Sequence, residues 1–130
     1  MSDQRVRLGD EELAFLRGGG PRALARIATV DERGRPHVVP GGWAWDDDAG
    51  ELVLGGRDVP TTRRARHVRA NGHVAVTIDG VDTAGGWAPW ALLLRCRARV
   101  DEARGEIRLR PDRVTSWGLG SVLTRRGPVA

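Results

Sequence analysis

The sequence predicts a mainly β protein, an antiparallel barrel of six or seven short strands with two short helices, formed as one domain by residues 1–130. Two observations predict this class. Short apolar or alternating runs are separated by turn residues along most of the chain, as in hairpin-linked strands. A chain of this length can bury one core but not two, and closing the sheet removes its exposed edges. Because so small a barrel fills its interior with side chains, a ligand is expected outside it or at a subunit interface.

The first half of the chain supplies a short helix and three strands. Asp10 can cap the helix, Leu16 then faces inward, and a glycine run that begins at Gly18 ends it. Trp43 and Trp45 fall on one face of the second strand, where they are expected in the core or in a dimer interface. The strands are expected at 24–30, 36–45 and 51–55, with hairpin turns at 31–34 and 46–50.

The second half begins with a helix at 61–70, because that stretch lacks β alternation and an Asn-Gly pair follows it. Alternation returns in a strand at 73–79. A long strand then carries apolar residues at every second position over 92–100, with arginines on the opposite face. Two shorter strands are expected, one around 107–109 and one at 114–117.

All 21 basic residues are arginines, and with 17 acidic residues the formal net charge is +4. This small excess suits an anionic ligand but does not by itself indicate nucleic acid. The single cysteine, Cys96, excludes an intrachain disulfide, and the three histidines lack cysteine or carboxylate neighbours at metal-ligand spacing. The polar first residues, and the lack of an apolar run long enough to span a bilayer, predict a cytoplasmic protein without a membrane partner.

The most informative stretch runs from Gly55 to Arg69 and holds five arginines at the end of a strand and along a helix. A helix N-terminus presents free N–H groups and partial positive charge, and Thr62 adds a hydroxyl there. These groups together predict a phosphate site. The alternative is the solvated basic face of a short surface helix. Only Ala65 and Val68 anchor this helix through apolar contacts, so a bound anion would help to fix it.

Several segments follow one another in an order and spacing found in a known family: 27–30, 34–40, 52–57, 62–71 and 107–119. They resemble the pyridoxamine 5'-phosphate oxidase-like split β-barrel superfamily, and within it the branch of reductases that uses the deazaflavin coenzyme F420. The resemblance implies an FMN-binding-like split barrel. It also implies a homodimer with two cofactor sites at the subunit interface.

In that family a hydroxyl-Arg-Lys triplet at the start of the helix that corresponds to 61–70 binds the cofactor phosphate. Thr62, Arg63 and Arg64 match that triplet. Trp87, in a glycine-rich loop, is expected either to cover a flat ring at the interface or to pack on its own barrel. The remaining residues implied to contact the ring or the anionic tail are Val39, Pro40, Gly41, Gly42, Gly55, Gly56, Arg57 and Arg66.

The sequence departs from the family pattern in three ways. Arg64 stands in place of lysine, which keeps the charge and changes the geometry. Gly41 and Gly42 stand where relatives have bulkier residues, which widens the pocket or weakens contact with the ring. The chain has no tyrosine, which excludes a phenolic proton donor. His37 is the nearest candidate acid, but a lone strand histidine is more often structural, so no catalytic residue is assigned.

The resemblance implies an F420-dependent oxidoreductase that transfers a hydride between the deazaflavin and an electron-poor double bond of a small organic substrate. Two alternatives keep the fold: an FMN-dependent oxidase or flavin-binding protein, and a cofactor-free biosynthetic enzyme, for which Gly41 and Gly42 are the only hint. A basic barrel that binds single-stranded nucleic acid is disfavoured, because the basic helix carries no interleaved aromatic residues apart from His67.

Overall fold

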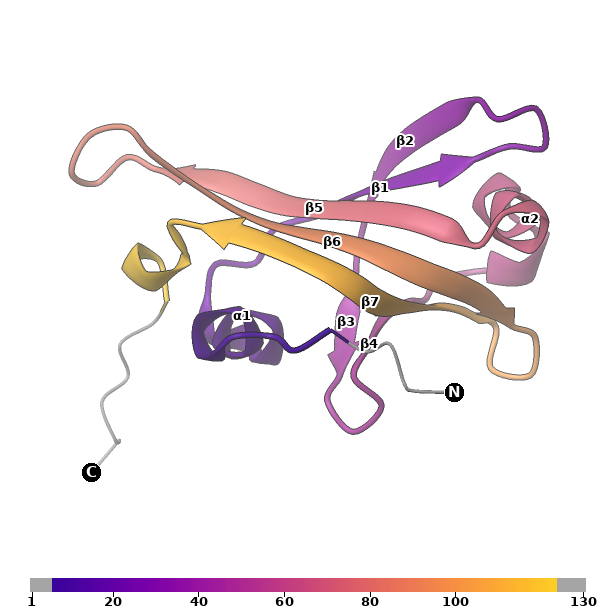
Figure 1. The fold of residues 1–130 in the computed structure, drawn as a ribbon, viewed down its shortest axis with the longest axis horizontal. Coiled ribbons are helices and arrows are strands. Elements are labelled where there is room, and N and C mark those ends of the chain that lie inside the picture. Colours follow the sequence, from indigo (N-terminus) through magenta and orange to yellow (C-terminus); the bar gives the residue numbers. More distant parts are fainter. Residues whose placement is uncertain (1–5, 124–130) are drawn as a thin grey trace.

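The computed structural model describes residues 6–123, whose seven strands form one antiparallel sheet with two short helices beside it (Figure 1). The strand order across the sheet is β2-β1-β5-β6-β7-β4-β3. The mainly β fold class is thereby confirmed. The elements are α1 (Asp10–Ala14), continued by a π-helical turn (Phe15–Gly19), β1 (Ala25–Val30), β2 (Pro36–Gly41), β3 (Ala44–Asp46), β4 (Glu51–Leu54), a 3₁₀ turn (Val59–Thr61), α2 (Arg63–Ala70), β5 (His73–Asp82), β6 (Ala88–Asp101), β7 (Glu106–Trp117) and a 3₁₀ turn (Leu119–Ser121).

The two edges of the sheet are consecutive in the chain. β2 pairs only with β1, β3 pairs only with β4, and just Gly42 and Trp43 join them. The sheet therefore has to curl until its edges meet, which makes it a split barrel. The prediction of one continuous strand over 36–45 was wrong, and Trp43 lies outside the strand that holds Trp45. The expectation that both tryptophans pack on the core is confirmed, since both are partly buried against it. Glycines 41 and 42 have no side chains to hold a straight strand, and the chain changes edges there.

A β-bulge replaces the predicted break between the last two strands. Arg95 lies opposite Arg113 while Cys96 lies opposite Pro111, so Asp112 is the extra residue. A bulge tolerates a proline, which has no N–H to donate to the ladder. The prediction of separate strands at 107–109 and 114–117 was therefore wrong, and β7 crosses the whole sheet.

The core follows the predicted alternation. Val74, Val76 and Ile78 of β5 are buried, and so are Leu92 and Leu94 of β6. Cys96 continues that buried row, and burial raises the pKa of its thiol to about 12. The long strands thus present one continuous apolar face to the barrel interior. The buried core residues are Phe15, Leu16, Ala25, Ile27, Leu52, Leu54, Val59, Ala65, Val68, Val74, Val76, Ile78, Trp90, Leu92, Leu94, Cys96, Ile107, Leu109 and Leu119.

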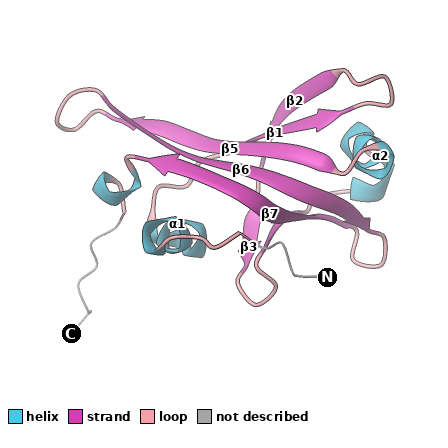
Figure 2. Ribbon diagram, viewed as in Figure 1, coloured by secondary structure: helices cyan, strands magenta, loops and turns pink. Residues whose placement is uncertain are grey.

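The helical segment at the N-terminus packs against the barrel, and α2 lies at the other end of the sheet (Figure 2). The fully buried Phe15 ring stacks on Trp43 with centroids 6.1 Å apart and meets Trp90 at 5.3 Å. Gly9 caps α1, and its N–H donates to the Glu12 carboxylate. Asp10, predicted as the cap, instead lies in the first turn, where its charge still favours the helix dipole.

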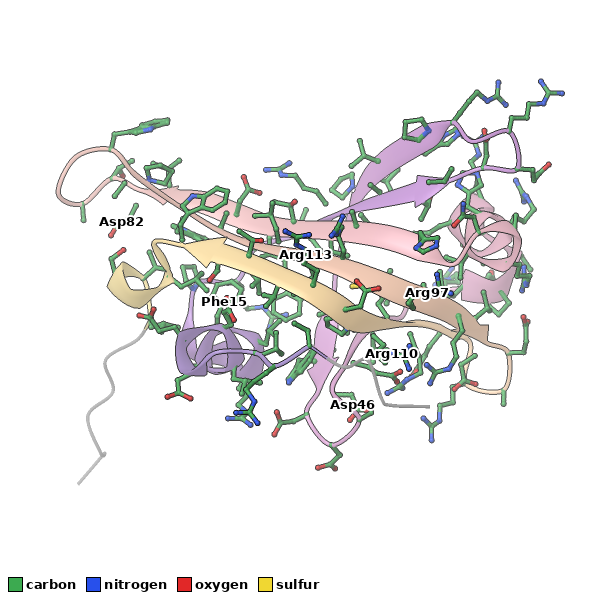
Figure 3. All side chains as sticks on the ribbon, viewed as in Figure 1. Phe15, Asp46, Asp82, Arg97, Arg110 and Arg113 are labelled. Carbon is green, nitrogen blue, oxygen red and sulfur yellow. The ribbon has the colours of Figure 1, made fainter. Side chains whose placement is uncertain are left out.

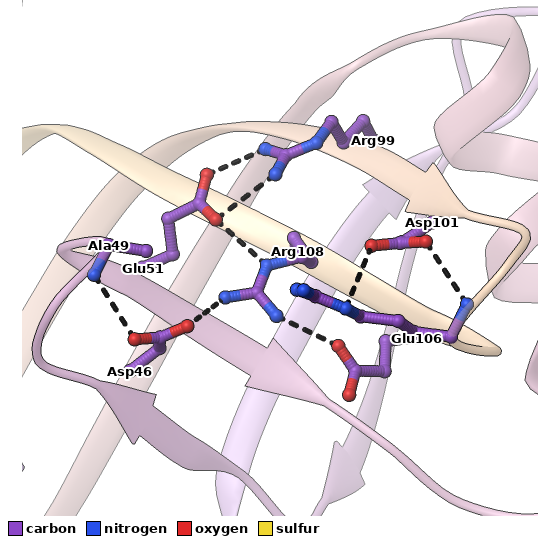
Figure 4. Close-up of polar contacts among 8 residues, drawn as sticks. Asp46, Ala49, Glu51, Arg99, Asp101, Glu106 and Arg108 are labelled. Atoms are coloured by element: carbon purple, nitrogen blue, oxygen red, sulfur yellow. Dashed lines mark hydrogen bonds and ion pairs between the residues drawn. The ribbon is translucent and has the colours of Figure 1, made fainter.

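A buried ion network ties β3 and β4 to β6 and β7 (Figure 4). The Arg108 guanidinium, only 4% exposed, donates from Nε to Glu51 at 2.8 Å and also pairs with Asp46 and Glu106. Arg99 donates two further bonds to Glu51. These bonds raise the pKa of Arg108 and hold that of Glu51 below its usual range. The network joins the β4 edge to the long strands.

Two further findings concern residues 6–123 as a whole. None of their helices is long and apolar enough to cross a membrane. Their His, Cys, Asp and Glu side chains form no group of three or more that is arranged to hold a metal ion.

Candidate functional site

The N-terminus of α2 is built by the residues that the sequence singled out. Thr62 is the N-cap: its Oγ1 accepts a hydrogen bond from the Ala65 N–H at 3.1 Å and donates one to the Val59 carbonyl at 2.7 Å. Helical geometry leaves the N–H groups of Arg63 and Arg64 without partners inside the helix. The helix begins at Arg63 instead of the predicted position 61, because 59–61 form a separate 3₁₀ turn.

Arg64 is the central cation of this site. Its Nε and Nη1 atoms are buried, and no acceptor among residues 6–123 lies within hydrogen-bond distance of either. Burial without a compensating anion lowers the pKa of the guanidinium. An unpaired, partly buried charge is unfavourable unless a ligand supplies the opposite charge.

Gly41 provides the space that Arg64 occupies. A Cβ on Gly41 would lie only 3.1 Å from Nη1 of Arg64 and 3.1 Å from Cδ1 of Ile27. The structure thus brings together two residues from different parts of the predicted site, one on β2 and one on α2. We call Gly41, Thr62, Arg63 and Arg64 the anion cradle.

The face of β2 that meets α2 continues from Gly41 through Val39 to His37, since alternate strand residues share a face. His37 lies against His67 of α2, with ring centroids 4.6 Å apart, just as Gly41 lies against Arg64. Between these two contacts Val39 remains 46% exposed. Four residues of strand, about 13 Å, therefore separate the histidine contact from the cradle.

The two histidines belong to a polar network under the β1–β2 turn. Asp31 accepts hydrogen bonds from the backbone N–H groups of Arg33 and Arg35, and from the Arg35 side chain, and His37 Nε2 lies 3.1 Å from it. These bonds hold the pKa of Asp31 far below its usual range, despite its burial. The β1–β2 turn thus fixes the orientation of His37.

His67 is buried and shares a 2.8 Å hydrogen bond with Thr29 through Nδ1. Burial lowers the pKa of His67, and His37 lowers it further, against the opposing charge of Asp31. The ring is therefore neutral at pH 7. No pattern in the sequence indicated that His67 belongs to this network, although its spacing of three residues from Arg64 places both on one helix face.

The other predicted residues lie around the cradle or away from it. Pro40 and Gly42 flank Gly41, while Gly55, Gly56 and Arg57 form an exposed loop between β4 and the 3₁₀ turn. Arg63 and Arg66 are exposed on α2. No carboxylate of the described residues pairs with Arg57, Arg63, Arg64 or Arg66, whereas Arg69 pairs with Glu102. These four arginines therefore keep their charge available for an anionic ligand.

Trp87 lies in the loop at the end of the sheet away from α2 (Figure 3). It is 78% exposed in the β5–β6 loop, and β5 leads from the end of α2 to that loop across ten residues, about 33 Å. Figure 3 labels Asp82, the last residue of β5, at the end of the sheet away from α2. Trp87 thus does not pack on its own barrel.

Known proteins resemble this chain over most of its length. Residues 9–117 match the family model described as pyridoxamine 5'-phosphate oxidase. A relative from Streptomyces rimosus, named 5a,11a-dehydrotetracycline/5a,11a-dehydrooxytetracycline reductase, is 29% identical over 119 residues, covering 84% of this chain and 82% of its own.

Solved structures share the fold at low identity. An F420 reductase superposes with a TM-score of 0.59 at 20% identity, covering 85% of this chain and 98% of its own. The heme storage protein HutZ from Vibrio cholerae superposes with a TM-score of 0.60 at 18% identity, covering 82% and 92%. The match over most of the length, with the split-barrel topology, shows that this chain belongs to the pyridoxamine 5'-phosphate oxidase family.

Proposed function

We propose that this protein is an oxidoreductase that binds the deazaflavin coenzyme F420 and transfers a hydride to an electron-poor double bond of a small organic substrate. One observation carries the proposal: the buried, unpaired guanidinium of Arg64 at the N-terminus of α2, held over Gly41. The reductase from Streptomyces rimosus and the F420 reductase fold support the redox assignment.

The cradle fits a phosphate group. The unsatisfied N–H groups of Arg63 and Arg64 and the guanidinium of Arg64 point to the same kind of ligand, a compact oxyanion. Arg63 would add a second guanidinium from the exposed side. Arg57 and Arg66 would hold the further negative charges of the F420 tail, and the β2 surface from Val39 to Gly42 would flank the ring.

The bound deazaflavin supplies hydride chemistry that no amino-acid side chain provides. The chain's own contribution is to anchor the phosphate, hold the ring along β2 and exclude water from the reacting faces. Proton return to the substrate requires no protein acid, because water can supply it.

The active unit we propose is a homodimer with one site at each end of the interface. Val38, Trp87 and Trp117 are exposed apolar side chains, 65%, 78% and 50% accessible, which a second copy would cover. In this arrangement Trp87 of one copy would cover the ring that the other copy holds.

FMN is the second candidate, because a single phosphate is all that the cradle itself requires. A side-by-side titration of the purified protein with F420 and FMN, followed by tryptophan quenching, separates the two. Saturation by F420 alone supports the proposal, and preference for FMN assigns the protein to the oxidase branch. Binding of neither compound overturns both assignments.

The decisive variant is Arg63→Ala/Arg64→Ala. Charge-assisted hydrogen bonds are worth about 1.5–3 kcal/mol each, so the double change should raise the dissociation constant at least about 100-fold. Arg33→Ala is the matched control, since Arg33 is another exposed arginine, in the β1–β2 turn. An unchanged dissociation constant in the double variant would remove the cradle from the proposal.

A further inference from the structure

An open hollow of about 520 Å³ lies next to the cradle, on the other side of the β2–β3 link. Its volume falls in the range of small-molecule sites. We call it the aromatic hollow. It is lined by residues 15–18 of the N-terminal helical segment, residues 20–24 before β1, and residues 42–45 of the link and β3.

The two indole rings in the wall of the aromatic hollow are fixed in place. The Trp43 indole stacks on the buried Phe15 ring, and its Nε1–H donates to the Ala23 carbonyl at 2.8 Å. The Trp45 Nε1–H donates to Asp47 at 3.0 Å. Leu24 adds an apolar side chain that is 60% exposed although it lies beside the core. Rigid aromatic walls of this kind favour a flat ring system.

The rim of the hollow carries one uncompensated positive charge. Arg17 and Arg22 both line it. Arg17 donates to Asp47 at 2.8 Å and is neutralised, whereas no carboxylate within the described part of the chain pairs with Arg22. A ligand with a single negative charge therefore complements the rim.

Two adjacent residues without side chains connect the hollow with the cradle. Gly42 lines the hollow, and its neighbour Gly41 lies against Arg64. A Cβ on Gly42 would meet nothing within 4 Å, so the space above this residue is open. A ring anchored through a phosphate at Arg64 would thus find open space at Gly42, on the edge of the hollow.

We propose that the aromatic hollow binds the hydride acceptor, and that the acceptor is a flat, fused-ring, largely apolar compound with one acidic oxygen. The assignment as acceptor rests on the proposed function. One alkene carbon gains the hydride from the reduced deazaflavin, the π electron pair moves to the adjacent carbonyl as an enolate, and a water proton completes the new C–H bond. The acceptor gains the two electrons that the deazaflavin loses.

The test uses the protein without cofactor, so that its failure is distinct from failure of the F420 titration. The probes are 9-anthracenecarboxylate, which is flat and singly charged, and 9-anthracenemethanol, which has the same rings and no charge. Binding is followed by quenching of tryptophan fluorescence and by the NMR signals of the five indole N–H groups. We expect saturable binding of both probes, tighter for the carboxylate, with shifts confined to Trp43, Trp45 and the adjacent Trp90.

Gly42→Leu is the blocking variant, because its side chain enters open space at the hollow without a clash in the fold. It should raise the dissociation constants of both probes at least tenfold. Gly85→Leu is the control, since a Cβ there also meets nothing within 4 Å, but in the distant β5–β6 loop. Equal thermal midpoints of the two variants establish that neither change unfolds the protein.

Arg22→Gln tests the charge. It should abolish the preference for the carboxylate and leave the affinity for the alcohol unchanged, while Arg33→Gln changes neither. The proposal would be overturned if neither probe showed saturable binding, or if Gly85→Leu weakened probe binding as much as Gly42→Leu. It would also be overturned if the indole N–H signals that shift were those of Trp87 and Trp117 and not those of Trp43 and Trp45.

Discussion

The guanidinium of Arg64 lies directly against the backbone of Gly41, where a Cβ would stand 3.1 Å from Nη1. An α2 side chain and a β2 backbone therefore share one small space. Any increase in side-chain size at position 41 has to displace the cation, so the identity of a strand residue controls the geometry of the anion cradle.

Gly41→Ala is expected to weaken phosphate binding about tenfold, the equivalent of about 1.4 kcal/mol. The added methyl pushes Arg64 away from the helix N-terminus and crowds Ile27, which costs about 1 kcal/mol of stability. Isothermal titration with inorganic phosphate measures the affinity. Gly42→Ala adds the same methyl to open space and should leave that affinity unchanged; equal losses in both variants would contradict the role of Gly41.

Arg64→Met should stabilise the ligand-free protein while it abolishes anion binding. The variant removes buried N–H groups that have no acceptor among residues 6–123, and it fills the same space with an apolar side chain. We expect the free energy of unfolding to increase by about 1 kcal/mol and Tm to rise by about 4 °C. The increase is at the low end of the cost of a buried unsatisfied group because Arg64 is only partly buried.

Thermal unfolding with and without phosphate measures both effects of Arg64→Met. Wild type should gain stability with phosphate as mass action requires, and the variant should not. A lower Tm of the variant without phosphate would show that Arg64 has a partner that stabilises it.

The buried histidine makes stability depend on pH. His67 has a lowered pKa in the folded state, so its contribution is fully present above its ordinary value of about 6.5 and is lost as pH falls through the folded value. The free energy of unfolding should therefore decrease from pH 7 to pH 5. Urea titrations at each pH measure this slope.

His67→Asn should flatten that slope, because an asparagine amide can keep the bond to Thr29 but does not titrate. His73→Asn is the control, since His73 lies on the exposed end of β5 and faces Arg97. A wild-type slope in the His67 variant would assign the pH dependence to another group. Asp31, whose pKa is also lowered, loses its contribution only at much lower pH.

The Arg108 network predicts an asymmetry between single and double substitutions. Arg108→Met leaves Arg99 as the remaining partner of the buried Glu51 carboxylate. It should lower the free energy of unfolding by about 3 kcal/mol. Adding Glu51→Leu removes the stranded charge and should recover most of that loss. Urea unfolding of the four proteins in the cycle gives the coupling energy, and simple additivity of the two losses would contradict the network.

The sequence predicted those parts of the site that depend on local chemistry. The hydroxyl of Thr62 and the arginines that follow it are consecutive residues, so the sequence indicates a helix N-terminus there, although it places the start at 61 and does not identify Thr62 as the cap. The contact between Gly41 and Arg64, and that between His37 and His67, join segments more than twenty residues apart. Periodicity indicates which face of an element is buried, but it does not indicate which element covers that face.

The same limit explains the errors in the fold. The run 36–45 has strand composition throughout, and only the pairing partners reveal that it belongs to both edges of the sheet. Likewise, Pro111 and Asp112 read as a break, while the neighbouring strand β6 holds both halves of β7 in one ladder.

The link of Gly42 and Trp43 has a consequence for the order of folding. The hairpins β1–β2 and β3–β4 each form from neighbours in sequence, and the link joins them before the barrel closes. The barrel closes only when β4 pairs with β7, which joins Leu54 to Ile107. Pairing of residues so far apart in sequence is a step of the kind that limits folding rates. The cradle combines the end of the first hairpin with a helix beyond the second, so it is complete only when α2 has packed against β1 and β6. An anion that binds there is therefore expected to slow unfolding and to leave the rate of folding nearly unchanged.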